Sequence, residues 1–146
     1  MFLNRGDGTF AEAAASLGLA DTELGTGVVC ADFDNDGDVD ILQLHDALTL
    51  WRNDTVNRNH LRVRLVGRAP NTEAAGARIT VTSNGVTQMR EVSIGSKFLS
   101  QDPTLQVFGL AGAEAADVSV QWPDGTETVR ADVAHGTLLV LTHPQR

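Results

Sequence analysis

The sequence of 146 residues is poor in several residue types that usually identify a class of protein. It has one cysteine, Cys30, one lysine, Lys97, and no tyrosine. A single cysteine excludes an internal disulfide, so cysteine content neither proves nor excludes an oxidising compartment. There is no run of about eighteen apolar residues, the minimum for a membrane-spanning helix. Residues 1–6 lack the apolar stretch of a signal peptide, and we expect any export signal to lie outside this sequence.

Basic residues are scarce in the first part of the chain. Residues 1–56 hold 11 acidic residues against two arginines, whereas residues 57–146 hold 8 acidic residues against 9 basic ones. The net charge of −8 therefore belongs to the first part. An acidic segment followed by a nearly neutral one without a basic stripe is not expected to bind nucleic acid. With 42% hydrophobic residues, the chain is long enough for one ordinary core or two small ones.

Negative charge is concentrated in residues 32–40, here called the aspartate loop. Its five aspartates alternate with other residues: Asp32, Asp34, Asp36, Asp38 and Asp40. No lysine or arginine lies between Arg5 and Arg52, so the sequence offers these carboxylates no nearby cationic partner. Without a bound divalent cation, their mutual repulsion would raise the pKa values of the carboxyls or force the loop open. The spacing, with Gly37 at the sharp turn, is typical of a calcium loop.

This pattern assigns each aspartate an expected role. We expect Asp32, Asp34 and Asp36 to bind calcium through their side chains. Asp38 would offer its backbone carbonyl, and Asp40 would complete the shell directly or through water. The alternative is a solvated Asp/Gly turn between two strands, without a metal.

The residues around the aspartate loop argue against an EF-hand. The twelfth position of an EF-hand loop requires a bidentate glutamate, and counted from Asp32 that position is Gln43. The flanking residues 27–31 and 39–44 are short and rich in β-branched side chains, which predicts strands rather than helices. The site is therefore expected to lie between two strands.

A polar stretch at residues 53–60 is interpreted as a linker, because it interrupts the apolar patterning where the charge changes. Before it we expect a strand running into a short alanine-rich helix within residues 9–19, and strands near 27–32, 40–45 and 48–52, about one four-stranded unit. After it we expect seven short strands, which favour an antiparallel sandwich or barrel. They are predicted at residues 61–66, 77–82, 86–94, 105–110, 117–122, 126–133 and 137–142. Asn84-Gly85 and Pro123-Asp124-Gly125 are expected hairpin turns.

Several segments, in the right order, resemble a known pair of modules. In the first part these are the turn Asn-Arg-Gly-Asp-Gly-Thr-Phe at residues 4–10, Leu-Gly-Leu at 17–19 and the aspartate loop. In the second part they are residues 76–81, 88–92, 98–101, 108–110 and 120–125. Together they resemble an FG-GAP (VCBS) repeat followed by an ASPIC/UnbV domain.

The resemblance implies an all-β fold, with one β-propeller-type FG-GAP blade in residues 1–56 and an antiparallel β-sandwich in residues 57–146. The resemblance also implies that the sequence is a C-terminal fragment of a longer exported protein, which is located outside the cell or in the cell envelope. The fragment is expected to begin inside the last strand of a missing blade. One blade cannot bury both faces alone, so we expect it to pack on the second domain, to pack on another copy, or to stay partly exposed. Packing on another copy would make the chain self-associate.

Other motifs have ordinary explanations. Arg5-Gly6-Asp7 matches an adhesion tripeptide but is already explained by the repeat turn. Asn53-Asp54-Thr55 fits the N-glycosylation pattern, which matters only in an exported eukaryotic chain. Trp51 and Trp122 are expected in the core rather than as sugar platforms. Arg62 and Arg64 should share one strand face, either as an anion- or carbohydrate-binding surface or as a solvated edge.

No catalytic arrangement is apparent in the sequence. The four histidines lack the short spacing of a zinc site, and only His45 has an adjacent acid, Asp46. Ser93, Ser96 and Ser100 lie outside any nucleophile elbow. We therefore expect a non-enzymatic, calcium-binding module for adhesion, assembly or scaffolding, with an unidentified protein or glycan partner outside the cell. The alternative is a carbohydrate-binding or enzyme accessory domain in which calcium is structural.

Overall fold

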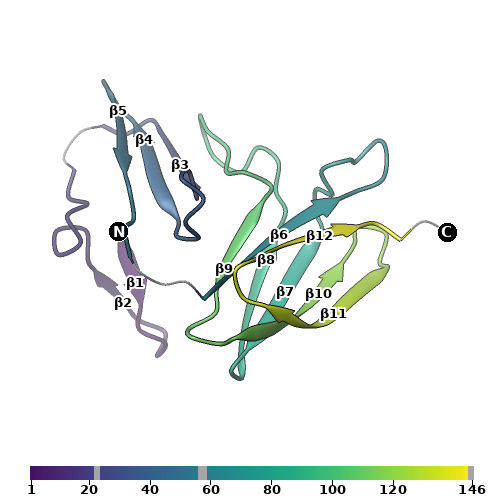
Figure 1. The fold of residues 1–146 in the computed structure, drawn as a ribbon. Coiled ribbons are helices and arrows are strands. Elements are labelled where there is room, and N and C mark those ends of the chain that lie inside the picture. Colours follow the sequence, from purple (N-terminus) through teal and green to yellow (C-terminus); the bar gives the residue numbers. More distant parts are fainter. Residues whose placement is uncertain (22–23, 56–58, 145–146) are drawn as a thin grey trace.

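The computed structural model describes residues 1–21, 24–55 and 59–144, and these residues form an all-β structure (Figure 1). None of them forms an α-helix, and none belongs to a helix that could cross a membrane. Five strands precede the linker: β1 (Phe2–Asn4), β2 (Phe10–Glu12), β3 (Gly27–Ala31), β4 (Asp40–Leu44) and β5 (Leu48–Trp51). Seven follow it: β6 (His60–Val66), β7 (Arg78–Ser83), β8 (Val86–Glu91), β9 (Gln106–Gly109), β10 (Ala115–Gln121), β11 (Glu127–Ala134) and β12 (Thr137–Thr142).

Strands β1 to β5, the N-terminal part, form two small sheets rather than the expected four-stranded unit. Strands β3, β4 and β5 pair in sequence order as an antiparallel sheet, whereas β2 pairs antiparallel with β1. The expected helix within residues 9–19 is wrong: β2 is followed by turns that end at Gly18, whose φ is +71°. The alanine run is too short to sustain a helix without packing partners.

Strands β6 to β12, the C-terminal part, form a four-stranded sheet, β11-β10-β7-β8, and a three-stranded sheet, β12-β6-β9. Their inward side chains form one buried cluster that includes Leu61, Ile79, Phe108 and Trp122. The sandwich is not wholly antiparallel, because β12 pairs in parallel with β6. A parallel pair needs a long crossover, and here the first and last strands of the sandwich are joined through all the others.

The two expected hairpin turns of the C-terminal part are confirmed. Asn84 and Gly85 join β7 to β8 with φ values of +47° and +76°, which a two-residue turn of this kind requires. Residues 123–125 lie between β10 and β11, and Trp122 is 2% exposed. The Trp122 indole N–H donates to Thr128 Oγ1 at 2.9 Å, which satisfies its polar group inside the core.

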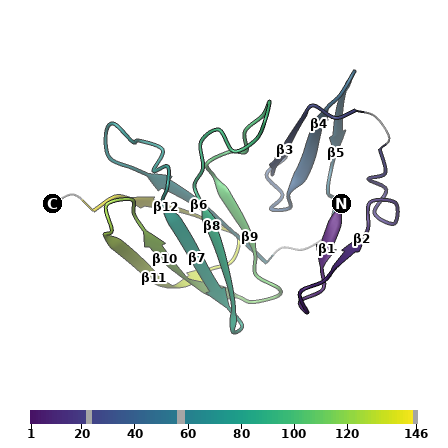
Figure 2. The ribbon, with the colours of Figure 1, turned by 180° about the vertical axis from the view of Figure 1, so that it is seen from behind.

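The two parts meet along β3. The segment between β8 and β9 extends toward the sheet of β3 to β5, and both views show the two lying side by side (Figures 1 and 2). Ser100 Oγ donates to Val28 O at 2.7 Å and accepts from Val28 N at 3.2 Å. These contacts bring the aspartate loop, which directly follows β3, close to the start of β6.

Candidate metal centre

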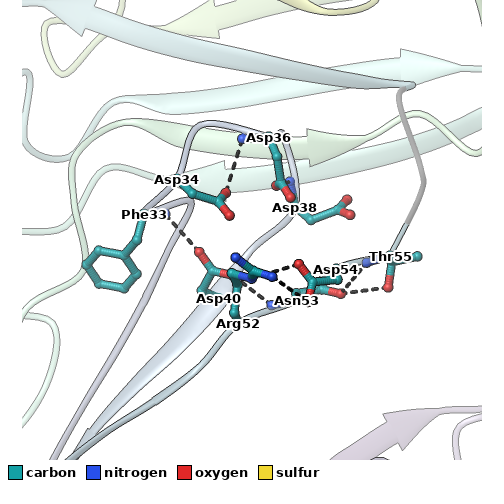
Figure 3. A network of polar contacts seen from close by, with 9 residues as sticks. All are labelled: Phe33, Asp34, Asp36, Asp38, Asp40, Arg52, Asn53, Asp54 and Thr55. Carbon is teal, nitrogen blue, oxygen red and sulfur yellow. Dashed lines mark hydrogen bonds and ion pairs between the residues drawn. The ribbon is translucent and has the colours of Figure 1, made fainter.

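The aspartate loop connects β3 to β4 and brings three of its five carboxylates together. One oxygen from each of Asp32, Asp34 and Asp40 lies within 4.8 Å of the others. Asp40 is buried at the start of β4. Asp32 is half-buried as a whole residue, although its side chain is buried, and Asp34 is exposed, so the group is open on one side. Figure 3 shows the Asp34 and Asp40 side chains within this loop, beside the segment that follows β5. Three converging carboxylates form the oxygen-rich donor set that Ca²⁺ prefers.

Asp40 holds the loop closed. It is 1% exposed, and its two oxygens accept backbone hydrogen bonds from Phe33 N at 2.9 Å and from Asn53 N at 2.8 Å (Figure 3). The carboxylate thus joins the beginning of the loop to the end of β5. Each oxygen retains lone-pair capacity beyond these bonds, so Asp40 is still able to bind a cation or a water.

Asp32 provides the observation that favours a cation. Its side chain is 2% exposed, and its Oδ2 accepts a hydrogen bond from Gly37 N at 3.2 Å. Its Oδ1 is buried and has no hydrogen-bond partner. A buried carboxylate oxygen without a partner is costly, whereas a metal ion at this point would satisfy it. The residues therefore fit a bound divalent cation.

Gly37 is required at the turn for two reasons. Its φ is +99°, a conformation that side chains rarely adopt, as the sequence pattern predicted. A Cβ atom at this position would also collide with the His60 imidazole, which approaches from the first strand of the C-terminal part. The second reason depends on packing between residues distant in sequence and was not predictable from the loop.

Asp36 and Asp38 lie outside the converging group. Asp36 Oδ1 accepts from Asp38 N at 2.9 Å, and Asp34 Oδ1 accepts from Asp36 N at 3.3 Å, so these side chains shape the turn (Figure 3). Desolvation raises the pKa of the Asp38 carboxyl, and the neighbouring Asp36 charge adds to that effect. Metal ligation by Asp36 and by the Asp38 carbonyl stays a prediction.

The expectation that the loop lacks a nearby cation holds along the sequence but is wrong in space. Arg62, on β6, places its Nη1 3.2 Å from Asn35 Oδ1 and 3.9 Å from Asp32 Oδ2, with 20% of its side chain exposed. Arg52 also lies nearby, but it pairs with Asp54 at 2.7 Å. Its hydrogen bond to Asp54 is the main cause that raises the pKa of Arg52, and Asp34 and Asp36 contribute to the rise.

The remaining predicted candidates mostly have local structural roles. His45 Nε2 lies 2.9 Å from Thr49 Oγ1, and its Nδ1 accepts from Ala47 N at 3.3 Å. Asp7 Oδ1 accepts from the amide and the hydroxyl of Thr9, as expected of the repeat turn. Both bonds lower the pKa of the Asp7 carboxyl, and the bond from the Thr9 hydroxyl has the larger effect. Arg64 is exposed, unlike Arg62 on the same strand face.

The polar pair of His143 and Asp124 was not predicted from the sequence. His143 is 9% exposed, packs edge-on against Trp122 with ring centroids 5.0 Å apart, and places Nε2 3.2 Å from Asp124 Oδ2. Hydrogen bonds from Thr126 are the main cause that lowers the Asp124 pKa to about 2. The Asp-Gly-Thr turn signalled the Thr126 contact, but nothing in the sequence joined it to a histidine near the C-terminus.

Comparison with known proteins matches both parts of the chain. The family model described as ASPIC and UnbV matches residues 67–146, and the model for an FG-GAP-like repeat matches residues 1–42. Cartilage acidic protein 1 of Homo sapiens is 35% identical over 125 residues, which cover 78% of this chain and 18% of that protein. The Mus musculus protein of the same name is 32% identical over 134 residues, covering 83% of this chain and 20% of that protein. The chain thus spans about a fifth of these curated relatives.

Proposed function

Because the chain belongs to the ASPIC and UnbV family and carries an FG-GAP-like repeat ahead of that domain, we propose that it is a non-enzymatic, calcium-binding module of an extracellular protein. Its role would be adhesion, assembly or scaffolding, with calcium acting structurally. The name of its relatives, cartilage acidic protein, supports a location outside cells, and the acidic N-terminal part is consistent with that name.

The observation that carries the proposal is the buried, unpartnered Asp32 Oδ1 beside two further carboxylates. Arg62 does not remove the need for a metal, because its Nη1 lies 3.9 Å from the other Asp32 oxygen. Arg52 is paired with Asp54, so Arg62 and this neutralised pair leave the loop of five aspartates with a strong net negative charge. A divalent cation bound by Asp32, Asp34 and Asp40 would offset that repulsion and tie β3 to β4.

Calcium fits this site better than magnesium. Magnesium demands nearly ideal octahedral geometry and gives up its waters reluctantly, whereas calcium accepts six to eight oxygen ligands in irregular shells. The exposed side of the group, next to Asp34, leaves room for water ligands. Affinities of sensors and extracellular modules run from micromolar to millimolar, so such a site would fill outside the cell.

Calcium titration by calorimetry, with melting in chelator and in millimolar calcium, tests the proposal. Calcium at about 100 times its Kd should stabilise the folded state by about 2.7 kcal/mol. Asp32→Asn should abolish most of the binding heat, because it removes the charge of the ligand whose buried Oδ1 has no other partner. Asp46→Asn makes the same charge change outside the aspartate loop and should retain binding. A calcium titration without binding heat, together with the same melting temperature in chelator and in millimolar calcium, would refute calcium binding.

A further inference from the structure

The only lysine and the only cysteine of the chain lie in contact. Lys97 Nζ is 3.9 Å from Cys30 Sγ, although the two residues are 67 positions apart. Cys30 belongs to β3 in the N-terminal part, and Lys97 belongs to the segment between β8 and β9 in the C-terminal part. The contact therefore bridges the two parts, outside the group of converging aspartates.

Asp102 fixes the geometry of this contact. Its Oδ1 accepts a hydrogen bond from Cys30 N at 2.9 Å and from Lys97 Nζ at 2.6 Å. One carboxylate oxygen thus holds the backbone of the cysteine and the head of the lysine side chain. Two residues earlier, Ser100 pairs with both backbone groups of Val28. The segment is docked on the edge of β3, so the nitrogen and the sulfur are held as neighbours rather than meeting by chance on a free surface.

Cys30 is half-buried and lies at a cavity large enough for a small oxidant. Cys30 and Asp102 line a cavity of about 270 Å³ between the two parts, together with Arg90 and Gln106. The side chains of Lys97 and Asp102 are 25% and 35% exposed. Dioxygen is far smaller than this cavity. The cysteine and the proton acceptor thus lie at this cavity, and the Lys97 side chain beside them is partly open to solvent.

We propose that Cys30 and Lys97 form a reversible covalent cross-link in which one oxygen atom bridges Sγ and Nζ. The Lys97 ammonium first gives a proton to Asp102 Oδ1. The amine and the thiol then each lose one hydrogen as the N–O and O–S bonds form. Nitrogen and sulfur each lose two electrons, and dioxygen gains these four, with one oxygen entering the bridge and the other leaving as water. The flexible lysine stem lets Nζ approach the sulfur as the bonds form.

The cross-link would stabilise this chain as a disulfide stabilises other proteins, by restricting the unfolded state. With one cysteine, an oxidising environment offers no internal disulfide. A bond between residues 30 and 97 would close a long stretch of chain, and constraints on long loops restrict the unfolded state most. It would also fasten the N-terminal part to the C-terminal part without any metal. The inference is independent of calcium, and its test is run in chelator.

Intact mass spectrometry of the purified chain in air-saturated and in anaerobic buffer tests the cross-link. Air should add the mass of one oxygen minus two hydrogens, remove the free thiol and raise the melting temperature. Digestion should yield one linked peptide pair containing Cys30 and Lys97. A thiol reductant should reverse every change, returning the thiol, the amine and water.

Lys97→Arg is the matched control, because arginine keeps a cation beside Asp102 but has no amine able to form the bridge. Cys30→Ser removes the sulfur. Neither variant should gain the mass or the thermal stabilisation in air. An unchanged mass in air, or the same product in the wild type and in Lys97→Arg, would overturn the proposal. The second result would identify ordinary thiol oxidation or an intermolecular disulfide instead.

Discussion

The two parts of the molecule are stabilised in different ways. Every member of the buried hydrophobic cluster belongs to the C-terminal part, between Leu61 and Leu141. Among its described residues, the N-terminal part contributes only Ala13 to the buried hydrophobic residues and leaves large side chains such as Phe2 and Phe10 more than 60% exposed. There the buried carboxylate of Asp40 instead closes a largely exposed polar loop. The sandwich is thus held by apolar packing, whereas the repeat is held by hydrogen bonds, charge and contact with its neighbour.

The largest effect is expected from a cavity in the sandwich. Phe108 is fully buried on β9, and Phe108→Ala should lower the free energy of unfolding by about 3–5 kcal/mol, because it removes apolar contacts and leaves a void. Denaturant unfolding followed by Trp122 fluorescence measures this. Val86→Ala, at a 57% exposed position, is the control and should change stability little. A small loss in Phe108→Ala would show that the cluster is not the source of stability.

An intermediate effect, confined to the N-terminal part, is expected when Asp40 is removed. Asp40→Ala leaves the amides of Phe33 and Asn53 without their acceptor, at a cost of about 2–3 kcal/mol. Hydrogen exchange should quicken in β3 to β5 and stay unchanged in β6 to β12. Exposed Asp46 offers the control, Asp46→Ala. Equal acceleration in both parts would mean that they unfold as one unit and would remove the contrast between them.

The smallest effect is expected at Asp124, in the C-terminal part. Its pKa is lowered from 3.8 to about 2 in the folded state, so its hydrogen bonds stabilise the fold above pH 3.8. That stabilisation is lost as the pH falls from about 4 through about 2. Asp124→Asn should therefore flatten the loss of melting temperature over this range. Glu127→Gln, at the start of β11, is the comparison, and a profile identical to wild type in Asp124→Asn would contradict the assignment.

The strands and turns were predictable from the sequence, because they follow from local patterns. The predicted segments 27–32, 40–45 and 48–52 correspond to β3, β4 and β5, and all seven later segments overlap a strand. The turn at Asn84-Gly85 and the burial of Trp122 were also correct. The exact linker stays a prediction, since residues 56–58 lie outside the described part of the chain.

What the sequence could not supply are contacts between segments far apart in the chain. The parallel pairing of β12 with β6, the approach of His60 to Gly37 and the position of Arg62 over the aspartate loop all depend on how the two parts pack. For the same reason, the aspartate spacing alone did not show that only three carboxylates converge. The match of residues 53–55 to the N-glycosylation pattern is no prediction of modification, and the Asn53 side chain already bonds with Thr55 and Val39.

The collision that a side chain at position 37 would make with His60 bears on how such modules recombine during evolution. The turn at Gly37 fits closely against His60 of the sandwich, and an unrelated domain would not place a histidine there. A repeat moved in front of an unrelated domain would lose both His60 and Arg62, and with them the surface against which its aspartate loop is fitted. The repeat and the sandwich should therefore be inherited together, and glycine should be kept at position 37, because a change at position 60 would relieve the collision but not the backbone strain at φ +99°.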